Sequence, residues 1–195
     1  MPRLSAAGLM VSRSPVRPTK DSSTLGSDVA KRLSDIGEVV NRPRGLDHGA
    51  WVPLKVMYPL ADVPVVQLSL PTDRADILLQ MGARLRDLRE QGVLVIGSGF
   101  MTHGLPFITP AMVEGKVPGW SRDFDAWAWD AISAGDVDAL AGFRQSAPGL
   151  PYAHPTVEHF TPLFVTLGAA TDLSSARTVI GGSMMGLSRR SLELV

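Results

Sequence analysis

Residues 64–97 read PVVQLSLPTDRADILLQMGARLRDLREQGVLVIG, and this stretch decides the fold class. It opens with a nearly continuous apolar run at residues 64–70 and closes with a second run at residues 93–96. Such runs are typical of strands that are buried on both faces of a parallel sheet. Between them, apolar residues recur at the three- and four-residue spacing of a helix: Leu78, Met81, Leu85 and Leu88. The stretch therefore predicts a strand, a crossover helix and a second, parallel strand joined in the right-handed sense.

The flanking sequence predicts further helices and a terminal hairpin. Residues 29–40 have helical apolar spacing, and residues 124–135, 136–147 and 160–167 are three more helical segments. Residues 178–188 have strand character interrupted by glycine, which indicates a C-terminal edge hairpin. Together these segments predict an α/β fold, with a mostly parallel central sheet flanked by helices in a single domain.

The first part of the chain differs from the rest in composition. Residues 1–28 are rich in Ser, Arg, Pro and Gly and show no sustained helical or strand period. We therefore expect residues 1–28 to be a loose or degraded segment, followed by one catalytic domain at residues 29–195.

Composition limits the chemistry and the partners. The chain has 195 residues, a formal net charge of zero and no cysteine. A neutral protein has no field to attract nucleic acid or anionic lipid, so a small neutral or modestly polar ligand is expected. Without cysteine, disulfides and iron–sulfur clusters are excluded, and His, Asp and Glu are the remaining metal ligands. With no apolar run of membrane-spanning length, the sequence predicts a cytoplasmic protein.

The four histidines fall in three short segments: residues 46–49 with His48, residues 101–104 with His103, and residues 154–159 with His154 and His159. Imidazole binds divalent metals and carries protons near neutral pH. His103 follows Gly97-Ser98-Gly99 at the carboxyl end of the second predicted strand, where ligand crevices form in α/β sheets. Alternatively, any single histidine could be a hydrogen-bonded core residue.

Two familiar motifs are excluded, and one dyad is disfavoured. Gly97-Ser98-Gly99 lacks the glycine spacing of a nucleophile elbow, and Thr102 stands where a dinucleotide loop needs its third glycine. Asp47 could orient His48, but adjacent side chains usually point apart, which favours a turn or capping role for Asp47.

The histidine segments and their surroundings resemble the class III extradiol ring-cleavage dioxygenases of the DOPA 4,5-dioxygenase-like group. The resemblance lies in four separate stretches in the same order: residues 45–54 (GLDHGAWVPL), 57–69 (MYPLADVPVVQLS), 97–103 (GSGFMTH) and 154–170 (HPTVEHF, then LGAA). It implies an enzyme that opens a catechol ring beside the diol with dioxygen, at one non-haem ion, Fe(II) or Zn(II).

The resemblance also implies roles for individual residues. His103 would be the proton-transfer residue or a metal ligand, His159 a metal ligand, and His48 a second catalytic group. The substrate pocket would further contain Asp47, Glu158 and His154. His154 would either contact the substrate or lie behind the residues that contact it.

The chain departs from this family near its start, where the family supplies two further metal-binding histidines. No histidine precedes His48, and residues 11–18 resemble the second of those turns with Arg13 near the histidine position. Arginine cannot replace the imidazole, because guanidinium has no free lone pair. A shortened sheet would leave residues 65–70 less covered, and a second copy in a homo-oligomer could cover them. The alternative hypothesis is an inactive, truncated relative that binds at most a small aromatic molecule or a partner chain.

Overall fold

The computed structural model describes residues 9–13, 22–37 and 45–195. The chain divides into two compact units. Unit 1 comprises Met1–Gly99 and Thr161–Ala169, and unit 2 comprises Phe100–Phe160 and Ala170–Val195. The single catalytic domain predicted at residues 29–195 stays a prediction, and each unit is described by itself.

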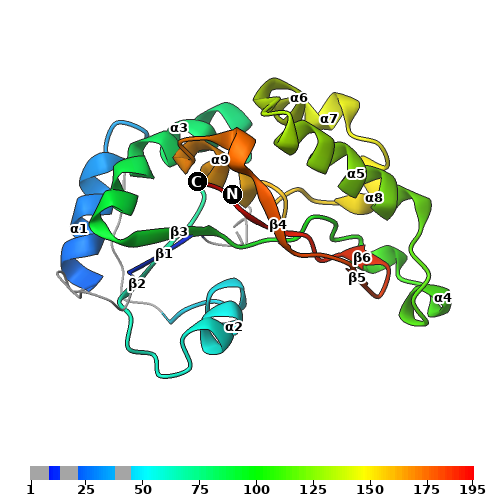
Figure 1. The fold of residues 1–195 in the computed structure, drawn as a ribbon, viewed down its shortest axis with the longest axis horizontal. Helices are drawn as coiled ribbons and strands as arrows, with labels where there is room; N and C mark the ends of the chain where they lie inside the picture. Colours follow the sequence, from blue (N-terminus) through cyan, green and yellow to red (C-terminus); the bar gives the residue numbers. More distant parts are fainter. Residues whose placement is uncertain (1–8, 14–21, 38–44) are drawn as a thin grey trace. The chain divides into compact units, whose positions relative to one another are not determined.

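Unit 1 is built on a three-stranded sheet (Figure 1). The sheet contains β1 (Leu9–Arg13), β2 (Val65–Leu68) and β3 (Val93–Gly97) in the order β2-β1-β3. Both neighbours run antiparallel to the central strand, with Val11 opposite Val66 on one side and Val95 on the other. Consequently β2 and β3 run in the same direction without pairing with each other.

The two predicted strands and their crossover helix are confirmed, but the mostly parallel sheet is not. Strand β1 lies between β2 and β3 and runs opposite to both, so the described pairings of this sheet are antiparallel. Within the segment 1–28 that we expected to be loose, residues 9–13 form a strand and a helix begins at Ser22. The division of the chain at residue 28 stays a prediction. Partner strands more than 50 residues away satisfy the backbone groups of β1, and no local period reveals such pairing.

Helices cover the two faces of this sheet unequally (Figure 1). On one face lie α1 (Ser22–Arg32), α3 (Ala75–Leu85) and α9 (Pro162–Ala169), and the 3₁₀ helix η1 (Arg86–Gln91) continues α3. The helices bury the following apolar side chains: Leu25, Val29, Leu78, Met81, Leu85, Leu88 and Val165. Helix α1 starts before the predicted residue 29, and residues 38–40 of that prediction lie outside the described residues.

The other face of the sheet carries α2 (His48–Met57), which contributes little core. It buries Ala50 and Leu54, against which Tyr58, Val65 and Ile96 pack. The expectation of strands buried on both faces is therefore corrected: all four residues of β2 are half-buried, and Leu94 in β3 is 43% exposed. A short helix with two buried residues leaves part of the strand surface uncovered.

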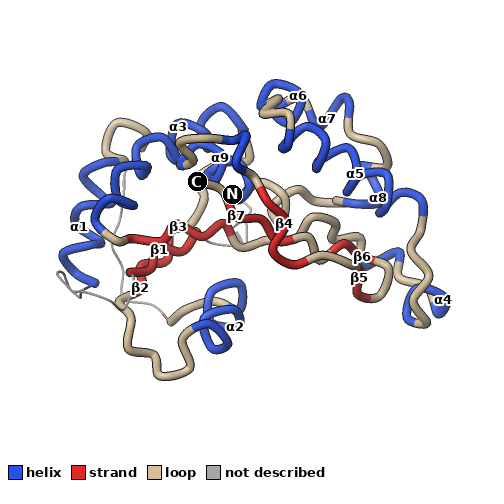
Figure 2. The backbone as a smooth tube through the Cα atoms, in the orientation of Figure 1, coloured by secondary structure: helices blue, strands red, loops and turns tan. Residues whose placement is uncertain are grey.

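Unit 2 is mainly helical (Figure 2). Its helices are η2 (Leu105–Phe107), α4 (Pro110–Val113), α5 (Gly119–Ser133), α6 (Val137–Ala141), α7 (Phe143–Ser146), α8 (Leu150–Ala153) and η3 (Leu173–Ser175). Three phenylalanines, Phe124, Phe143 and Phe160, pack ring against ring in its core. The helix predicted at residues 136–147 is divided at Gly142, and α5 begins before the predicted residue 124.

The end of the chain forms two short antiparallel pairs. Strand β4 (Arg177–Ile180) pairs with β7 (Ser191–Glu193), and β5 (Ser183–Met184) pairs with β6 (Leu187–Ser188). Met185 and Gly186 join β5 to β6 with φ values of 49° and 74°, the signs required by a type I′ turn. The predicted hairpin is thus present, but it forms its own two-stranded sheet. Within the described residues, no helix combines the length and apolar character needed to cross a bilayer.

Candidate functional site

Unit 2 brings two predicted histidines into direct contact. The rings of His103 and His159 stack with 3.6 Å between centroids and 32° between planes. Glu158 adds a carboxylate, with its Oε1 atom 3.9 Å from Nε2 of His159. The side chains of His159 and Glu158 are 18% and 19% exposed, so each is shielded but reachable. Two imidazoles and a carboxylate, drawn from the segments 101–104 and 154–159, therefore form one cluster.

Glu158 remains negatively charged in this cluster at neutral pH. Partial burial alone would raise the pKa of its carboxyl, but a hydrogen bond from Thr156 Oγ1 at 2.7 Å and the nearby imidazoles lower it below the ordinary value. The cluster therefore places an anionic carboxylate oxygen 3.9 Å from Nε2 of His159.

His154 lies behind this cluster and is 2% exposed. Its Nε2 atom is 2.9 Å from the backbone oxygen of Met101, which can only accept, so Nε2 carries the proton. Its Nδ1 atom is buried and has no hydrogen-bond partner among the described residues. Burial lowers the pKa of His154 to about 4, so the ring is neutral. Its predicted place in the substrate pocket stays a prediction.

Backbone contacts fix the segment that carries His103. The N–H of His103 donates to Ala153 O at 2.7 Å, and the N–H of Phe100 donates to His159 O at 2.8 Å. Gly104 allows a close approach, since a Cβ atom there would lie 2.2 Å from Tyr152 O and 2.7 Å from the Trp120 ring. The contact between the two histidines thus rests on main-chain hydrogen bonds and on a required glycine.

A polar network that the sequence does not reveal lies beside His103. Its members are Thr102, Ser121, Asp125, Ser188 and Arg190. Thr102 and Ser188 are 86 positions apart in the chain, so no local spacing points to their contact. The Arg190 guanidinium carbon also lies 5.0 Å from the centre of the Trp129 ring.

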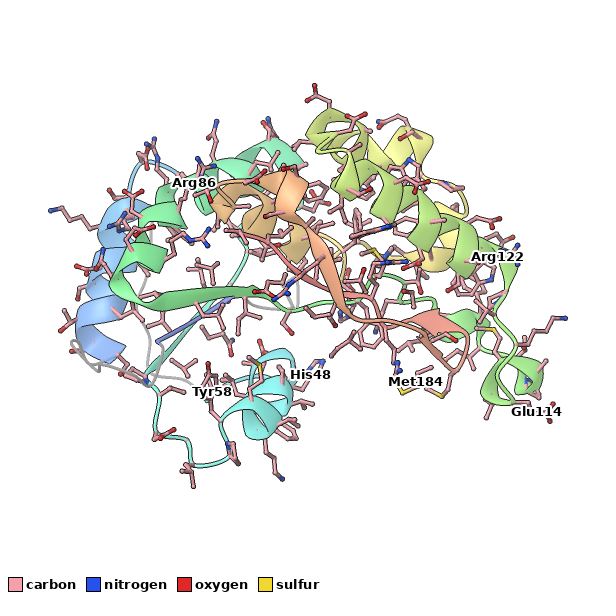
Figure 3. All side chains as sticks on the ribbon, viewed as in Figure 1. His48, Tyr58, Arg86, Glu114, Arg122 and Met184 are labelled. Atoms are coloured by element: carbon pink, nitrogen blue, oxygen red, sulfur yellow. The ribbon has the colours of Figure 1, made fainter. Side chains whose placement is uncertain are left out.

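The remaining predicted site residues, His48 and Asp47, belong to unit 1. His48 is exposed at the first position of α2 (Figure 3). Asp47 caps that helix by accepting from the Ala50 N–H at 3.1 Å, which confirms the capping role, and its other carboxylate oxygen accepts from Gln67 at 2.8 Å. That these two residues share a pocket with His103 stays a prediction.

The described residues do not fit a complete metal site. No group of three or more His, Cys, Asp or Glu side chains able to hold an ion occurs in residues 22–37 and 45–195. Ferrous oxygenases use at least two histidines and a carboxylate. His103 and His159 could supply two imidazoles, but Glu158 does not complete a three-ligand group with them. Arg13, where the resemblance expects a histidine, is the last residue of β1.

Comparison with known proteins identifies the family. Residues 10–184 match the catalytic LigB subunit of aromatic ring-opening dioxygenase. The chain is 42% identical over 168 residues to "4,5-DOPA dioxygenase extradiol" of Beta vulgaris, covering 82% of this chain and 62% of the relative. For the protein of that name in Mirabilis jalapa, the identity is 41% over 132 residues, covering 67% of this chain and 49% of the relative. The chain thus spans between about half and two thirds of these relatives.

The fold has a counterpart among solved structures. The crystal structure of an uncharacterized protein from Escherichia coli K12 superposes with a TM-score of 0.77 at 28% identity, covering 92% of this chain and 75% of that chain. Together with the match over residues 10–184 and the 42% identity to a plant relative, this shows that the chain belongs to the LigB family of class III extradiol ring-cleavage dioxygenases, in its DOPA dioxygenase-like group.

Proposed function

We propose that this protein opens the ring of a DOPA-like catechol with dioxygen, as an extradiol dioxygenase. The observation that carries the proposal is the stacked pair of His103 and His159, with a charged carboxylate at its edge. Family membership and relatives named as DOPA dioxygenases support the reaction class. Because the chain spans only part of those relatives, the activity is proposed for this chain and not carried over from them.

The chemistry requires a group that moves protons next to the ring. A catechol hydroxyl must lose its proton before the ring becomes electron-rich enough to react, and that proton is later needed when the product forms. His103 is suited to both steps because it is half-buried, held by its backbone and in contact with a second imidazole. His159 lies against the His103 ring, and the anionic Glu158 carboxylate is 3.9 Å from Nε2 of His159.

The overall reaction balances without a further reductant. Dioxygen is the four-electron oxidant, and both of its atoms enter the product. The carbon–carbon bond beside the diol breaks, one of its carbons becoming a carboxylate and the other an aldehyde. The ion that this reaction class uses, Fe(II) or Zn(II), needs at least one ligand beyond His103 and His159, and no step above depends on where it binds.

The test uses the chain loaded anaerobically with Fe(II) and then mixed with DOPA or catechol in the presence of dioxygen. We expect a yellow ring-opened product and consumption of one dioxygen per catechol. His103→Gln should lower kcat by about 10²–10⁴-fold, the usual contribution of a positioned proton-transfer group. The matched control is Arg122→Gln, an exposed position on α5 in the same unit, which should retain normal turnover.

Two outcomes would count against the proposal. Wild-type protein that stays colourless and consumes no dioxygen after loading would favour the inactive relative that binds at most a small aromatic molecule. Normal turnover by His103→Gln would instead remove His103 from the proton-transfer role. The names of the relatives favour the active enzyme over the inactive one.

A further inference from the structure

Thr102, the neighbour of His103 in the chain, makes an unusual set of buried contacts. Its side chain is fully buried, and its Oγ1 atom accepts a hydrogen bond from the backbone N–H of Ser188 at 2.7 Å. The same oxygen lies 3.0 Å from Oγ of Ser121, a contact in which either hydroxyl can donate. One hydroxyl group thus ties the His103 segment to helix α5 and to strand β6.

The β6 end of this contact is itself anchored by an ion pair. Ser188 Oγ donates to Asp125 Oδ1 at 2.6 Å. Arg190 donates to both carboxylate oxygens of Asp125, from Nε to Oδ1 at 2.9 Å and from Nη2 to Oδ2 at 2.6 Å. The Arg190 guanidinium also lies over the Trp129 ring and donates to Thr178 Oγ1 at 2.8 Å. Planar, bidentate pairing of this kind is geometrically specific, so Ser188 is held in one position.

We infer that Thr102 and Asp125 are positioning residues, which fix the His103 imidazole against His159 by holding the neighbouring backbone through Ser188. Because Thr102 and His103 share a peptide bond, the contacts that anchor the Thr102 side chain also restrict the backbone that carries His103. Displacement of a reacting group by about 1 Å can cost roughly 10²-fold in rate. The catalytic part of this inference rests on the proposed function, whereas the geometric part does not.

The variants separate positioning from simple support of the fold. Thr102→Val keeps the volume but removes the hydroxyl, and Thr102→Ser keeps the hydroxyl but removes a methyl group. If the contact positions His103, Thr102→Val lowers kcat by about 10–100-fold with little change in KM, and Thr102→Ser recovers most of the loss. Thr166→Val is the matched control, because Thr166 Oγ1 donates to the Leu163 oxygen one turn earlier in α9, and its kcat should be that of wild type.

Nuclear magnetic resonance gives a readout that does not require turnover. In the wild type, the 3.6 Å ring contact should produce a proton–proton cross-peak between His103 and His159. Thr102→Val should weaken that cross-peak and shift the His103 ring nitrogens, while Thr166→Val should leave both unchanged. If the wild type opens no catechol, the proposed function fails, and the cross-peak still decides the positioning role.

Three results would overturn the inference: an unaltered cross-peak in Thr102→Val, unaltered kcat in a catalytically active protein, or a kcat loss that Thr102→Ser fails to recover. Should Thr102→Val not fold, Asp125→Asn replaces it, since the amide keeps the shape of the side chain but loses the negative charge that pairs with Arg190. The same cross-peak and kcat measurements then apply, with a weaker cross-peak expected and an unchanged one counting against the inference.

Discussion

At the scale of single residues, the two histidines of the segment 154–159 have opposite surroundings. His154 is enclosed by Phe124 and Phe160, with ring centroids 5.0 and 5.3 Å away, whereas His159 keeps an accessible edge against His103. A protonated ring in the first environment would lose hydration without gaining an anionic partner. His154 thus acts as a neutral donor to Met101 O, which leaves His103 and His159 as the histidines of this unit for which we propose proton transfer.

The buried His154 should make folding stability depend on pH. Its pKa is about 4 in the folded protein against about 6.5 when unfolded, so between these values the unfolded chain binds the extra proton. Stability is thus complete above pH 6.5 and falls as the pH drops towards 4, with a total loss of about 3 kcal/mol. From pH 7 to 5 we expect about 2 kcal/mol of this loss, measured as the free energy of unfolding in urea.

His154→Gln provides the comparison, because its amide can donate to the Met101 oxygen but does not titrate in this range. The variant should show a shallower decrease between pH 7 and 5 than the wild type. Equal slopes for the two proteins would mean that His154 is protonated in the folded state and that its assigned burial is incorrect.

Residue types were predictable here, but their environments were not. The sequence located His103 and His159 in loops and indicated proton chemistry, since imidazole has few alternatives in that role. It could not separate His154 from them, because the burial of His154 depends on Met101, 53 positions away. The Asp47 cap was predictable from its position just before α2, since capping is a local interaction.

At the scale of elements, α3 and α9 cross with their backbones almost touching. A Cβ atom on Gly82 would lie 2.1 Å from Val165 O, and one on Gly168 would lie 2.1 Å from Leu79 O. Arg86 adds a hydrogen bond across the same crossing, 2.8 Å from Nη2 to Gly168 O. Leu78 in α3 and Val165 in α9 are both fully buried.

Alanine at either glycine should therefore be destabilising, although alanine normally favours a helix by about 1 kcal/mol over glycine. Backbone atoms cannot move aside as a flexible side chain can, so Gly168→Ala should cost about 1–3 kcal/mol of unfolding free energy as an overpacked contact. Gly119→Ala, at the first turn of α5 with ordinary 3.7 Å neighbours, is the control and should be neutral or stabilising. Similar melting temperatures for the two variants would contradict the close crossing.

Unit 1 also shows which elements could be predicted from the sequence. Helix α3 follows from a local apolar period and strand β3 from a local apolar run, and the positions of both are confirmed. Strand β1 has only five residues, and its place between β2 and β3 is decided by pairing with distant segments. The order of strands in a sheet is thus non-local information, which explains why a parallel sheet was expected where an antiparallel one was found.

At the scale of the whole molecule, we expect the balance of charge to control solubility. The chain carries 19 Lys and Arg against 19 Asp and Glu, which gives a formal net charge of zero at pH 7. Charge repulsion between molecules is then minimal, and apolar side chains on the surface face no electrostatic barrier to association. Such side chains are present on and after α2, where Val56 and Leu60 are each 81% exposed.

We therefore expect solubility to be lowest near the isoelectric point of about 6.9 and to rise towards pH 5.5 and 8.5, measured by precipitation with polyethylene glycol at constant ionic strength. Val56→Glu and Val56→Lys remove the same exposed apolar group but change the charge in opposite directions. If charge controls solubility, the pH of lowest solubility moves down in the glutamate variant and up in the lysine variant, by about 0.5–1 pH unit. If exposed apolar surface controls it instead, both variants become more soluble while the pH of the minimum stays fixed.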